Sequence, residues 1–261
     1  MNIAVCVKQV PDASEVKIDP ETGTMKREGV PAILNPFDAY AVEEAVRIKE
    51  KVGGRVTALT MGPPQAAEVL RHVVAMGVDD VMLISDRAFA GADTWATTYT
   101  LGLGLKKLPS LDLVICGKQA IDGDTAQVGP GLAENLGMPF VAYVRKVVEI
   151  SDTVVKVERL IEDGYEVVEV SLPAVMTVVK EINTPRMPSL KGKMKAKGLE
   201  ILPVGAAALG ALPENIGLAG SPTKVVKVFT PPPKGKREVI DGSPEEQAAK
   251  VVLKLRELKV I

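Results

Sequence analysis

The sequence has few of the residues that carry out chemistry in enzymes without a cofactor. Its 261 residues include one histidine, two cysteines and 3% aromatic residues. His72 lies in QAAEVLRHVVAMG, whose apolar spacing is typical of an amphipathic helix, while Cys6 and Cys116 lie in separate apolar runs that indicate core thiols. This pattern favours neither a catalytic triad, nor a disulfide framework, nor a metal site. We therefore expect no catalytic side chain or metal ligand set on this chain, and a bound cofactor that supplies the chemistry.

An excess of charge of one sign is also missing. The chain has 32 Lys and Arg against 33 Asp and Glu, a formal net charge of −1. Binding to nucleic acid without sequence preference depends on a positive field, so nucleic acid is not an expected partner. No run reaches the ~18 apolar residues of a membrane span, and the N-terminus lacks a basic segment ahead of a long apolar stretch. We expect no membrane span and a cytoplasmic location.

What the chain does have is an alternation of short apolar runs with segments of helical period. NIAVCVKQV, RVTALTMG, DDVMLIS and LDLVICG each precede a helix-like segment. Short strands that are apolar on both faces and joined by helices predict an α/β fold with a mostly parallel sheet and helices on both faces. Ligands of such sheets bind beyond the carboxyl ends of the strands, here after Val7, Met61, Ser85 and Cys116.

The pattern changes after about residue 140. TVVKVERLIE and YEVVEVSLPA flank Asp163 and Gly164, a pair typical of a tight hairpin, so we expect an antiparallel extension of the sheet. Residues 16–28, VKIDPETGTMKRE, predict a small surface hairpin.

The chain is expected to form an α/β domain over residues 1–230, followed by an arm over 231–261. PPPKGK at 231–236 breaks regular structure, and the segment after it has the Ser cap, the Pro start and the apolar spacing of a terminal helix. Either this arm covers a partner or it folds back on its own sheet.

The most informative segment, GKQAIDGDTAQVGPGLAENLG at 117–137, directly follows an apolar strand. Its glycines and a helix that begins near Thr125 or Pro130 would gather free backbone N–H groups at one place, which suits a phosphate or pyrophosphate. The alternative is an ordinary helix cap formed by Asp124 and Gln127. The segment matches neither GxGxxG nor the P-loop pattern.

Two helix starts are further candidates. In NPFDAYAVEEAVRIKE, Asn35 is a cap and Pro36 occupies the first helical position, but Asn35 could also reach the base or ribose of a ligand. In GADTWATTYTLGLGLKK, Asp93, Thr94 and Thr97 crowd the first turns of a helix. Their oxygens either cap that helix or contact phosphate oxygens or a flavin edge.

A long polar segment that includes residues 183–198 is predicted to be an irregular functional loop. Leu190 stands there among cations, namely Arg186, Lys191, Lys193, Lys195 and Lys197. Such a charge run is either a solvated face or a docking patch for an acidic partner, in which the cations steer the encounter and the leucine anchors it.

Six segments that occur in order along the chain carry a family resemblance. They are VKQVPD, NPFDAYAVEEAVRIKE, MGP at 61–63, AMG at 75–77, GKQAIDGDTAQVG and the PR…SL…MKAK loop. Together they resemble the beta subunit of electron transfer flavoprotein over nearly the whole chain. The resemblance implies a Rossmann-like domain without a complete active site of its own, and an obligate alpha subunit that carries the electron-transferring FAD and is contacted by the C-terminal arm.

The resemblance also implies that this chain binds an adenine nucleotide, AMP in simple carriers and a second FAD in electron-bifurcating ones. The contacts implied by position are Cys6, Asn35, Pro36, Phe37, Asp38, Met61, Gly117, Lys118, Gln119, Ala120, Ile121, Asp122, Gly123, Asp124, Thr125, Ala126, Gln127, Val128, Gly129 and Pro130. Because carboxylates repel a pyrophosphate, we assign Asp122 and Asp124 to loop shaping and expect direct contacts from Thr125 and Gln127. The loop around Leu190 resembles the recognition loop that anchors acyl-CoA dehydrogenases.

GADTWATTYTL resembles the bifurcating group, in which Asp93, Thr94 and Thr97 help to hold the second flavin. In that interpretation NADH reduces the flavin on this subunit. One electron then passes to ferredoxin or flavodoxin, and the other passes through the alpha-subunit FAD to an acyl-CoA dehydrogenase. The alternatives are an AMP-binding simple carrier and a free-standing nucleotide-binding or nucleotide-hydrolysing domain, although the chain lacks the SGGxDS loop of the ATP pyrophosphatases.

Overall fold

The computed structural model describes residues 1–12, 17–18, 25–26, 31–226 and 239–261. The chain divides into two compact units, Met1–Val226 and Lys227–Ile261. The run expected as a linker at 231–236, and with it the expected boundary after residue 230, lies outside the described residues.

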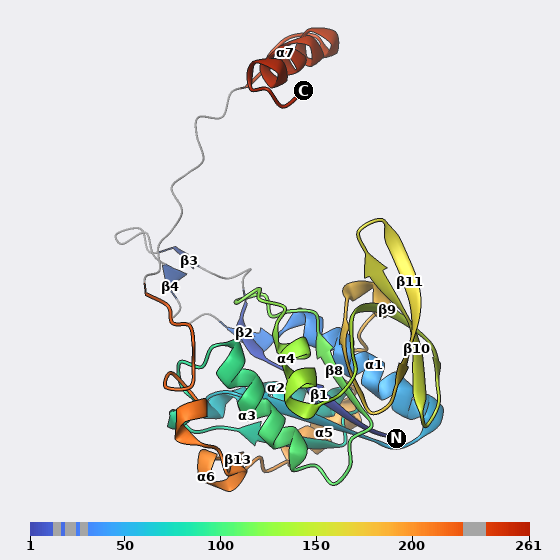
Figure 1. Cartoon of the computed structure of the whole chain (residues 1–261), viewed down its shortest axis with the longest axis vertical. Helices are drawn as coiled ribbons and strands as arrows, with labels where there is room; N and C mark the ends of the chain where they lie inside the picture. Colours follow the sequence, from blue (N-terminus) through green and yellow to red (C-terminus); the bar gives the residue numbers. More distant parts are fainter. Residues whose placement is uncertain (13–16, 19–24, 27–30, 227–238) are drawn as a thin grey trace. The chain divides into compact units, whose positions relative to one another are not determined.

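The second unit contains the helix α7 (Pro244–Glu257), which begins as the sequence predicts (Figure 1). The Ser243 hydroxyl accepts a hydrogen bond from the Glu246 N–H, and the Glu246 carboxylate accepts one from the Ser243 N–H. This reciprocal cap satisfies two of the N–H groups that a helix leaves without a partner at its start. All residues of α7 are exposed or partly exposed, so its apolar side chains are available for a contact outside the helix.

The first unit is built on a nine-stranded sheet with the order β11-β10-β9-β12-β8-β1-β6-β7-β13. Its strands are β1 (Asn2–Cys6), β6 (Arg55–Met61), β7 (Asp80–Ile84), β8 (Leu113–Gly117), β9 (Phe140–Ile150), β10 (Val154–Ile161), β11 (Gly164–Ser171), β12 (Ala174–Val178) and β13 (Pro203–Val204). In the spatial order β9-β12-β8-β1-β6-β7-β13, every pair of neighbouring strands is parallel. At the other side of β9, β10 pairs antiparallel with both β9 and β11. The predicted mostly parallel sheet with an antiparallel extension is confirmed, and Figure 1 shows the extension in yellow.

Helices cover both faces of this sheet. α1 (Pro36–Val52) and α2 (Ala67–Met76) pack on one face, and α3 (Thr94–Lys106) and α4 (Val128–Leu136) lie side by side on the other (Figure 1). Successive strand residues point to opposite faces, so Ile3 joins the core under α1 and Ala4 joins the core under α3. Strands buried on both faces have to be apolar throughout, which is the pattern of the sequence.

The direction of the chain across the sheet reverses at β1. The chain passes outward from β1 to β6 and β7, and then returns to β8 on the other side of β1. Cys6 and Cys116, near the carboxyl ends of β1 and β8, are register partners. Open α/β sheets bind ligands in the crevice beyond the strand ends at such a reversal. The sequence suggests four loops as candidates for a ligand site, and the fold favours two of them, the loops after β1 and β8.

Shorter elements fill the connections. β2 (Gln9–Pro11) pairs antiparallel with β5 (Ala32–Leu34), and β3 (Lys17–Ile18) with β4 (Met25–Lys26). The second pair has the antiparallel pairing expected of the predicted hairpin, and residues 19–24 between its strands lie outside the described residues. The remaining elements are α6 (Ala206–Leu209) and the 3-10 turns η2 (Pro64–Ala66), η3 (Arg87–Phe89), η4 (Lys180–Ile182) and η5 (Pro213–Asn215). Within the described ranges, no helix is long and apolar enough to cross a membrane.

Two local predictions differ from the structure. In the hairpin of β10 and β11, Ile161 pairs with Gly164, so the turn consists of Glu162 and Asp163 and begins one residue earlier than expected. The segment predicted as an irregular loop contains a helix, α5 (Leu190–Lys197), which buries only Ala196 against α2. One buried residue gives too little apolar periodicity to reveal a helix.

Candidate functional site

The loop after β8 has an unusual backbone at the reversal point. Asp124 and Ala126 both have φ of 53°, and Gln127, which follows Ala126, is right-handed with φ of −102°. Neighbouring residues of opposite hand turn successive N–H groups toward one concave side, which suits an anion. The loop leads directly into α4 at Val128, whose first N–H groups have no carbonyl partner within the helix. Helix start and loop together can hold a phosphate without a cationic side chain.

Asn35 ties this loop to α1. Its side chain is almost fully buried and spans the loop, since Nδ2 donates to the Gln119 carbonyl at 2.9 Å and Oδ1 accepts from the Ile121 N–H at 3.2 Å. The sequence predicts Asn35 as a helix cap, and the residue does occupy that position. Its side chain, however, serves the loop after β8, so a change at Asn35 would release residues 119–121.

Asp38 likewise connects α1 to the end of a strand. It is buried, and its Oδ2 accepts a hydrogen bond from the Lys8 N–H at 2.8 Å. Burial raises the pKa of Asp38 to about 7, although hydrogen bonds from Asn35, Lys8 and Gly117 oppose this shift. Gly117 has to be a glycine here, because a Cβ would collide with the Asp38 carboxylate and the Phe37 backbone.

The carboxylates of the loop have partners within the protein. Lys8 Nζ lies 2.7 and 2.8 Å from the two oxygens of Asp122, and Gln119 Nε2 donates to Asp124. The Asp124 side chain therefore contacts the loop itself. The sequence suggested Asp124 as part of a cap for α4, but Gln127 occupies the cap position of that helix.

The start of α3 joins the same loop. Thr94 Oγ1 donates to Gln127 Oε1 at 2.9 Å. Asp93 caps α3 by accepting from the Ala96 N–H, and its other oxygen accepts from the N–H and the hydroxyl of Thr223. Burial acts to raise the pKa of Asp93, but these hydrogen bonds outweigh it and keep the pKa below its usual range. Thr97 lies half-buried one turn further along α3.

Three other residues were predicted to contact the nucleotide, namely Cys6, Met61 and Lys118. Cys6 and the partly buried Met61 belong to the core on the α3 and α4 side of the sheet. The neighbouring Cys6 thiol and burial raise the pKa of Cys116, so that thiol stays neutral. Lys118 instead lies over the ring of Tyr143 in β9, with Nζ 5.4 Å from the ring centre. The structure thus brings the predicted residues of β1, α1, β6, β8, α3 and α4 to one end of the sheet.

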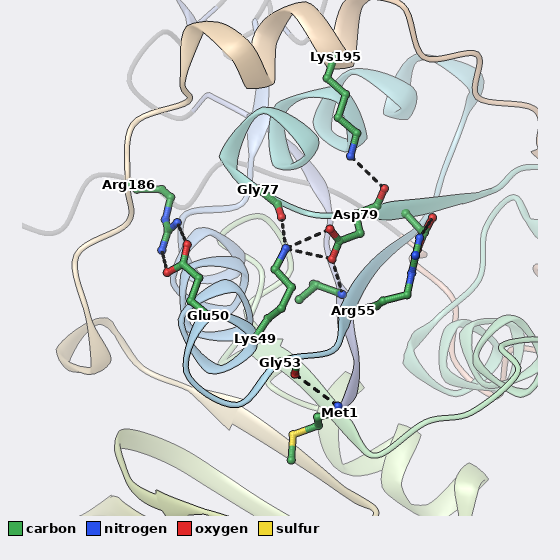
Figure 2. Close-up of polar contacts among 11 residues, drawn as sticks. Met1, Lys49, Glu50, Gly53, Arg55, Gly77, Asp79, Arg186 and Lys195 are labelled. Carbon is green, nitrogen blue, oxygen red and sulfur yellow. Dashed lines mark hydrogen bonds and ion pairs between the residues drawn. The ribbon is translucent and has the colours of Figure 1, made fainter.

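The segment 183–198 is held firmly on α1 and α2. Arg186 forms ion pairs with Glu43 at 2.8 Å and with Glu50 at 2.6 Å, and these carboxylates raise the pKa of its guanidinium. Asn183 Nδ2 donates to Glu44, and Lys195 Nζ donates to the carbonyl oxygen of Asp79. Figure 2 shows Arg186 beside Glu50 and Lys195 above Asp79.

Three long apolar side chains of this segment are nonetheless open to water. Met187 is 87% exposed, Leu190 78% and Met194 71%. We call these three residues the α5 apolar patch. Sequence reasoning found Leu190 and missed both methionines, of which Met187 lies before the start of α5 and Met194 lies within it. Leu190 and Met194 are four residues apart on α5 and so lie on one helix face, and exposed long apolar side chains that lie together are typical of protein interaction sites.

The sheet order, the reversal at β1 and the glycine-rich loop after β8 define a Rossmann-like α/β protein. Residues 22–209 match the family model described as "Electron transfer flavoprotein domain". The chain belongs to the electron transfer flavoprotein family and is similar to its beta subunits along its whole length.

Three relatives illustrate this similarity. The chain is 54% identical to "Caffeyl-CoA reductase-Etf complex subunit CarD" of Acetobacterium woodii, over 100% of both chains. It is 52% identical to "Electron transfer flavoprotein subunit beta" of Clostridium acetobutylicum, over 98% of each. It is 44% identical to "Acryloyl-CoA reductase electron transfer subunit gamma" of Anaerotignum propionicum, over 100% of both. The predicted family is therefore confirmed.

Proposed function

We propose that this chain is the beta subunit of a heterodimeric electron transfer flavoprotein and that it binds FAD at the end of β1 and β8. In this proposal it takes part in electron bifurcation. FAD held there would supply the redox chemistry: a hydride from NADH would bring two electrons, which would leave one at a time, one to ferredoxin or flavodoxin and one to the alpha-subunit FAD, which serves an acyl-CoA dehydrogenase.

The observation that carries this proposal is the hydrogen bond between Thr94 and Gln127. AMP would need only the loop after β8 and the start of α1. The bond extends the same site to the start of α3, which adds a second helix N-terminus and the Thr94 hydroxyl. The backbone N–H groups at that helix start are donors that the second half of a dinucleotide would need, and Thr94, whose proton goes to Gln127, would offer its hydroxyl oxygen as an acceptor. Two relatives whose printed names include a CoA reductase are consistent with this choice.

The residues of this chain would bind and orient the cofactor. The loop from Asp124 to Val128 offers N–H groups to the pyrophosphate, and Asn35 holds that loop in place. The proposal assigns contacts with the flavin ring system to Thr94 and Thr97. The proposal assigns proton and electron transfer to the flavin and the nicotinamide, and binding and exclusion of water to this chain.

The α5 apolar patch is the proposed docking surface for the acyl-CoA dehydrogenase. Leu190 anchors the contact, and Lys191, Lys193, Lys195 and Lys197 attract an acidic partner. Arg186 serves this surface indirectly, because its charge is taken up by Glu43 and Glu50. We further propose that the arm that ends in α7 contacts the alpha subunit, as its exposed apolar residues would require a cover.

The second candidate is a beta subunit that binds AMP and only shuttles electrons. One observation favours it: both carboxylate oxygens of Asp93 are engaged with Ala96 and Thr223, as in a purely structural helix cap. In that case the start of α3 needs no ligand.

The nucleotide released on denaturing the purified complex of this chain with its alpha subunit distinguishes the two candidates. Two FAD per heterodimer, with bleaching of the flavin by NADH, is the expected result. One FAD and one AMP would establish the simple carrier.

A double variant, Thr94→Val with Thr97→Val, tests the role of α3 in the same assay. We expect the flavin occupancy of this subunit to fall several-fold, since each hydroxyl removed takes away a hydrogen bond of ~1 kcal/mol. Thr153→Val, in an exposed turn, is the matched control. Full occupancy in the double variant would exclude α3 from the site.

A further inference from the structure

Met187 follows directly after a residue that is fixed on α1. The backbone N–H and the side chain of Arg186 both donate to the Glu43 carboxylate, at 3.0 and 2.8 Å, and the guanidinium also donates to Glu50 at 2.6 Å (Figure 2). Glu43 is buried, and a buried polar network whose members have partners is rigid. The exposed Met187 side chain therefore extends from a fixed point of the surface.

Met194 lies on a helix that is equally fixed, in this case on α2. Ser189, the cap of α5, donates its N–H to the Ala75 carbonyl at 3.2 Å. Gly192 lies so close to the same residue that a Cβ would collide with the Ala75 backbone. Ala196 is buried in a small cluster with Ala75. These contacts keep α5 from turning Met194 toward the core, so the α5 apolar patch is a surface of fixed shape.

A thioether that is held in water is open to oxidation. Hydrogen peroxide gives one oxygen atom to the methionine sulfur: an S–O bond forms, the O–O bond breaks and water leaves, so the sulfur is oxidised and the peroxide is reduced. The other methionines whose side chains the structure describes are buried or partly buried, namely Met1, Met61, Met76, Met82, Met138 and Met176. Within this set, the two methionines of the α5 apolar patch are the most accessible to peroxide.

We propose that Met187 and Met194 are a modification site, at which hydrogen peroxide forms methionine sulfoxides that weaken docking of the partner. The inference rests on the proposed function, because it takes the α5 apolar patch as the docking surface. Each sulfoxide adds a strongly polar S–O bond to the patch, and a partner that covers Leu190 would bury the new oxygen away from water. Leu190 has no sulfur and stays unmodified, and reduction of the sulfoxides restores the apolar surface.

The test begins with the purified complex of this chain and its alpha subunit, which receives a limited dose of hydrogen peroxide that catalase then removes. Mass spectrometry of tryptic peptides measures the oxidised fraction of each methionine. A purified acyl-CoA dehydrogenase, added only afterwards, is the probe of docking. We expect Met187 and Met194 to be oxidised before Met61, Met82 and Met138, and reduction of the dehydrogenase to slow about tenfold. Treatment with the two methionine sulfoxide reductases, one for each epimer, should restore the rate.

A double variant, Met187→Leu with Met194→Leu, removes both sulfur atoms and keeps apolar side chains of similar volume. Each protein is compared with its own untreated sample, so the starting rates need not agree. We expect the double variant to keep its own rate after peroxide. Met138→Leu removes a partly buried methionine outside the α5 apolar patch and is the matched control, which should slow like wild type.

Oxidation that begins at the partly buried methionines overturns the inference, and so does a double variant that slows as much as wild type. An unchanged rate after both methionines are oxidised, with a slow Leu190→Ala variant, also overturns it but leaves the docking surface in place. Failure of the proposed function looks different: Leu190→Ala then reduces the dehydrogenase at the wild-type rate without any peroxide, and the inference is wrong together with the docking surface.

Discussion

The two candidate sites of this protein depart from the usual rule that apolar side chains are buried and polar side chains are exposed, and each departs from a different half of it. At the reversal point the polar residues Asn35 and Asp38 are buried, whereas at α5 the apolar Leu190 and Met194 are exposed. A buried polar group is stable only when it is fully bonded, and an exposed apolar group gains only when a partner covers it. The polar side chains of the first site therefore have partners within the chain, whereas the apolar side chains of the second remain open to water.

Both sites are held by the same helix. The start of α1 carries Asn35 and Asp38 for the nucleotide loop, and its later turns carry Glu43 and Glu50 for Arg186. Substitutions can therefore test whether the two sites act separately. A change at the buried site should remove the nucleotide, and a change at the exposed site should affect only the partner.

The largest effect is expected for Asn35→Ala. The substitution leaves the Gln119 carbonyl and the Ile121 N–H without their partner, which costs about 2 kcal/mol of stability and frees the loop. We expect nucleotide occupancy to fall by on the order of a hundredfold, since the loop loses its fixed position as well as a contact. Chromatography of the released nucleotide and thermal unfolding measure the two effects. Normal occupancy would mean that Asn35 has no part in holding the site.

A smaller effect, confined to the other site, is expected for Leu190→Ala. Truncation of an exposed anchor at an interface costs more than ~1 kcal/mol, so reduction of the acyl-CoA dehydrogenase should slow about tenfold. Nucleotide content and NADH oxidation should stay unchanged. Leu212→Ala removes a half-exposed leucine outside the α5 apolar patch and serves as the control. Unchanged transfer kinetics in Leu190→Ala would exclude the patch as the docking surface.

Features that depend on the local sequence could be predicted, whereas contacts that depend on the tertiary structure could not. The parallel sheet follows from strands that are apolar on both faces, and the loop after β8 follows from its glycines at the end of a strand. The bond from Asn35 to Gln119 could not be predicted, because it joins residues 84 apart that only the finished sheet brings together. The ion pairs of Arg186 with α1 depend on the tertiary structure in the same way, and the charge run gave no sign that this cation is already paired.

The smallest effect separates steering from anchoring within the docking segment. Lys191 and Lys193 are exposed, so their charges act mainly on the encounter of the two proteins. With both residues changed to glutamine, we expect the rate of dehydrogenase reduction to fall about threefold at low salt and to match wild type near 1 M salt, where the Debye length is only about 3 Å. Glutamine at the exposed Lys106 and Lys107, at the end of α3, is the matched control. Leu190→Ala should keep its defect at every salt concentration, because burial of an apolar side chain is not screened by ions. If the glutamine variant were equally slow in high salt, the lysines would act by direct contact, and the division between anchor and steering charges would be wrong.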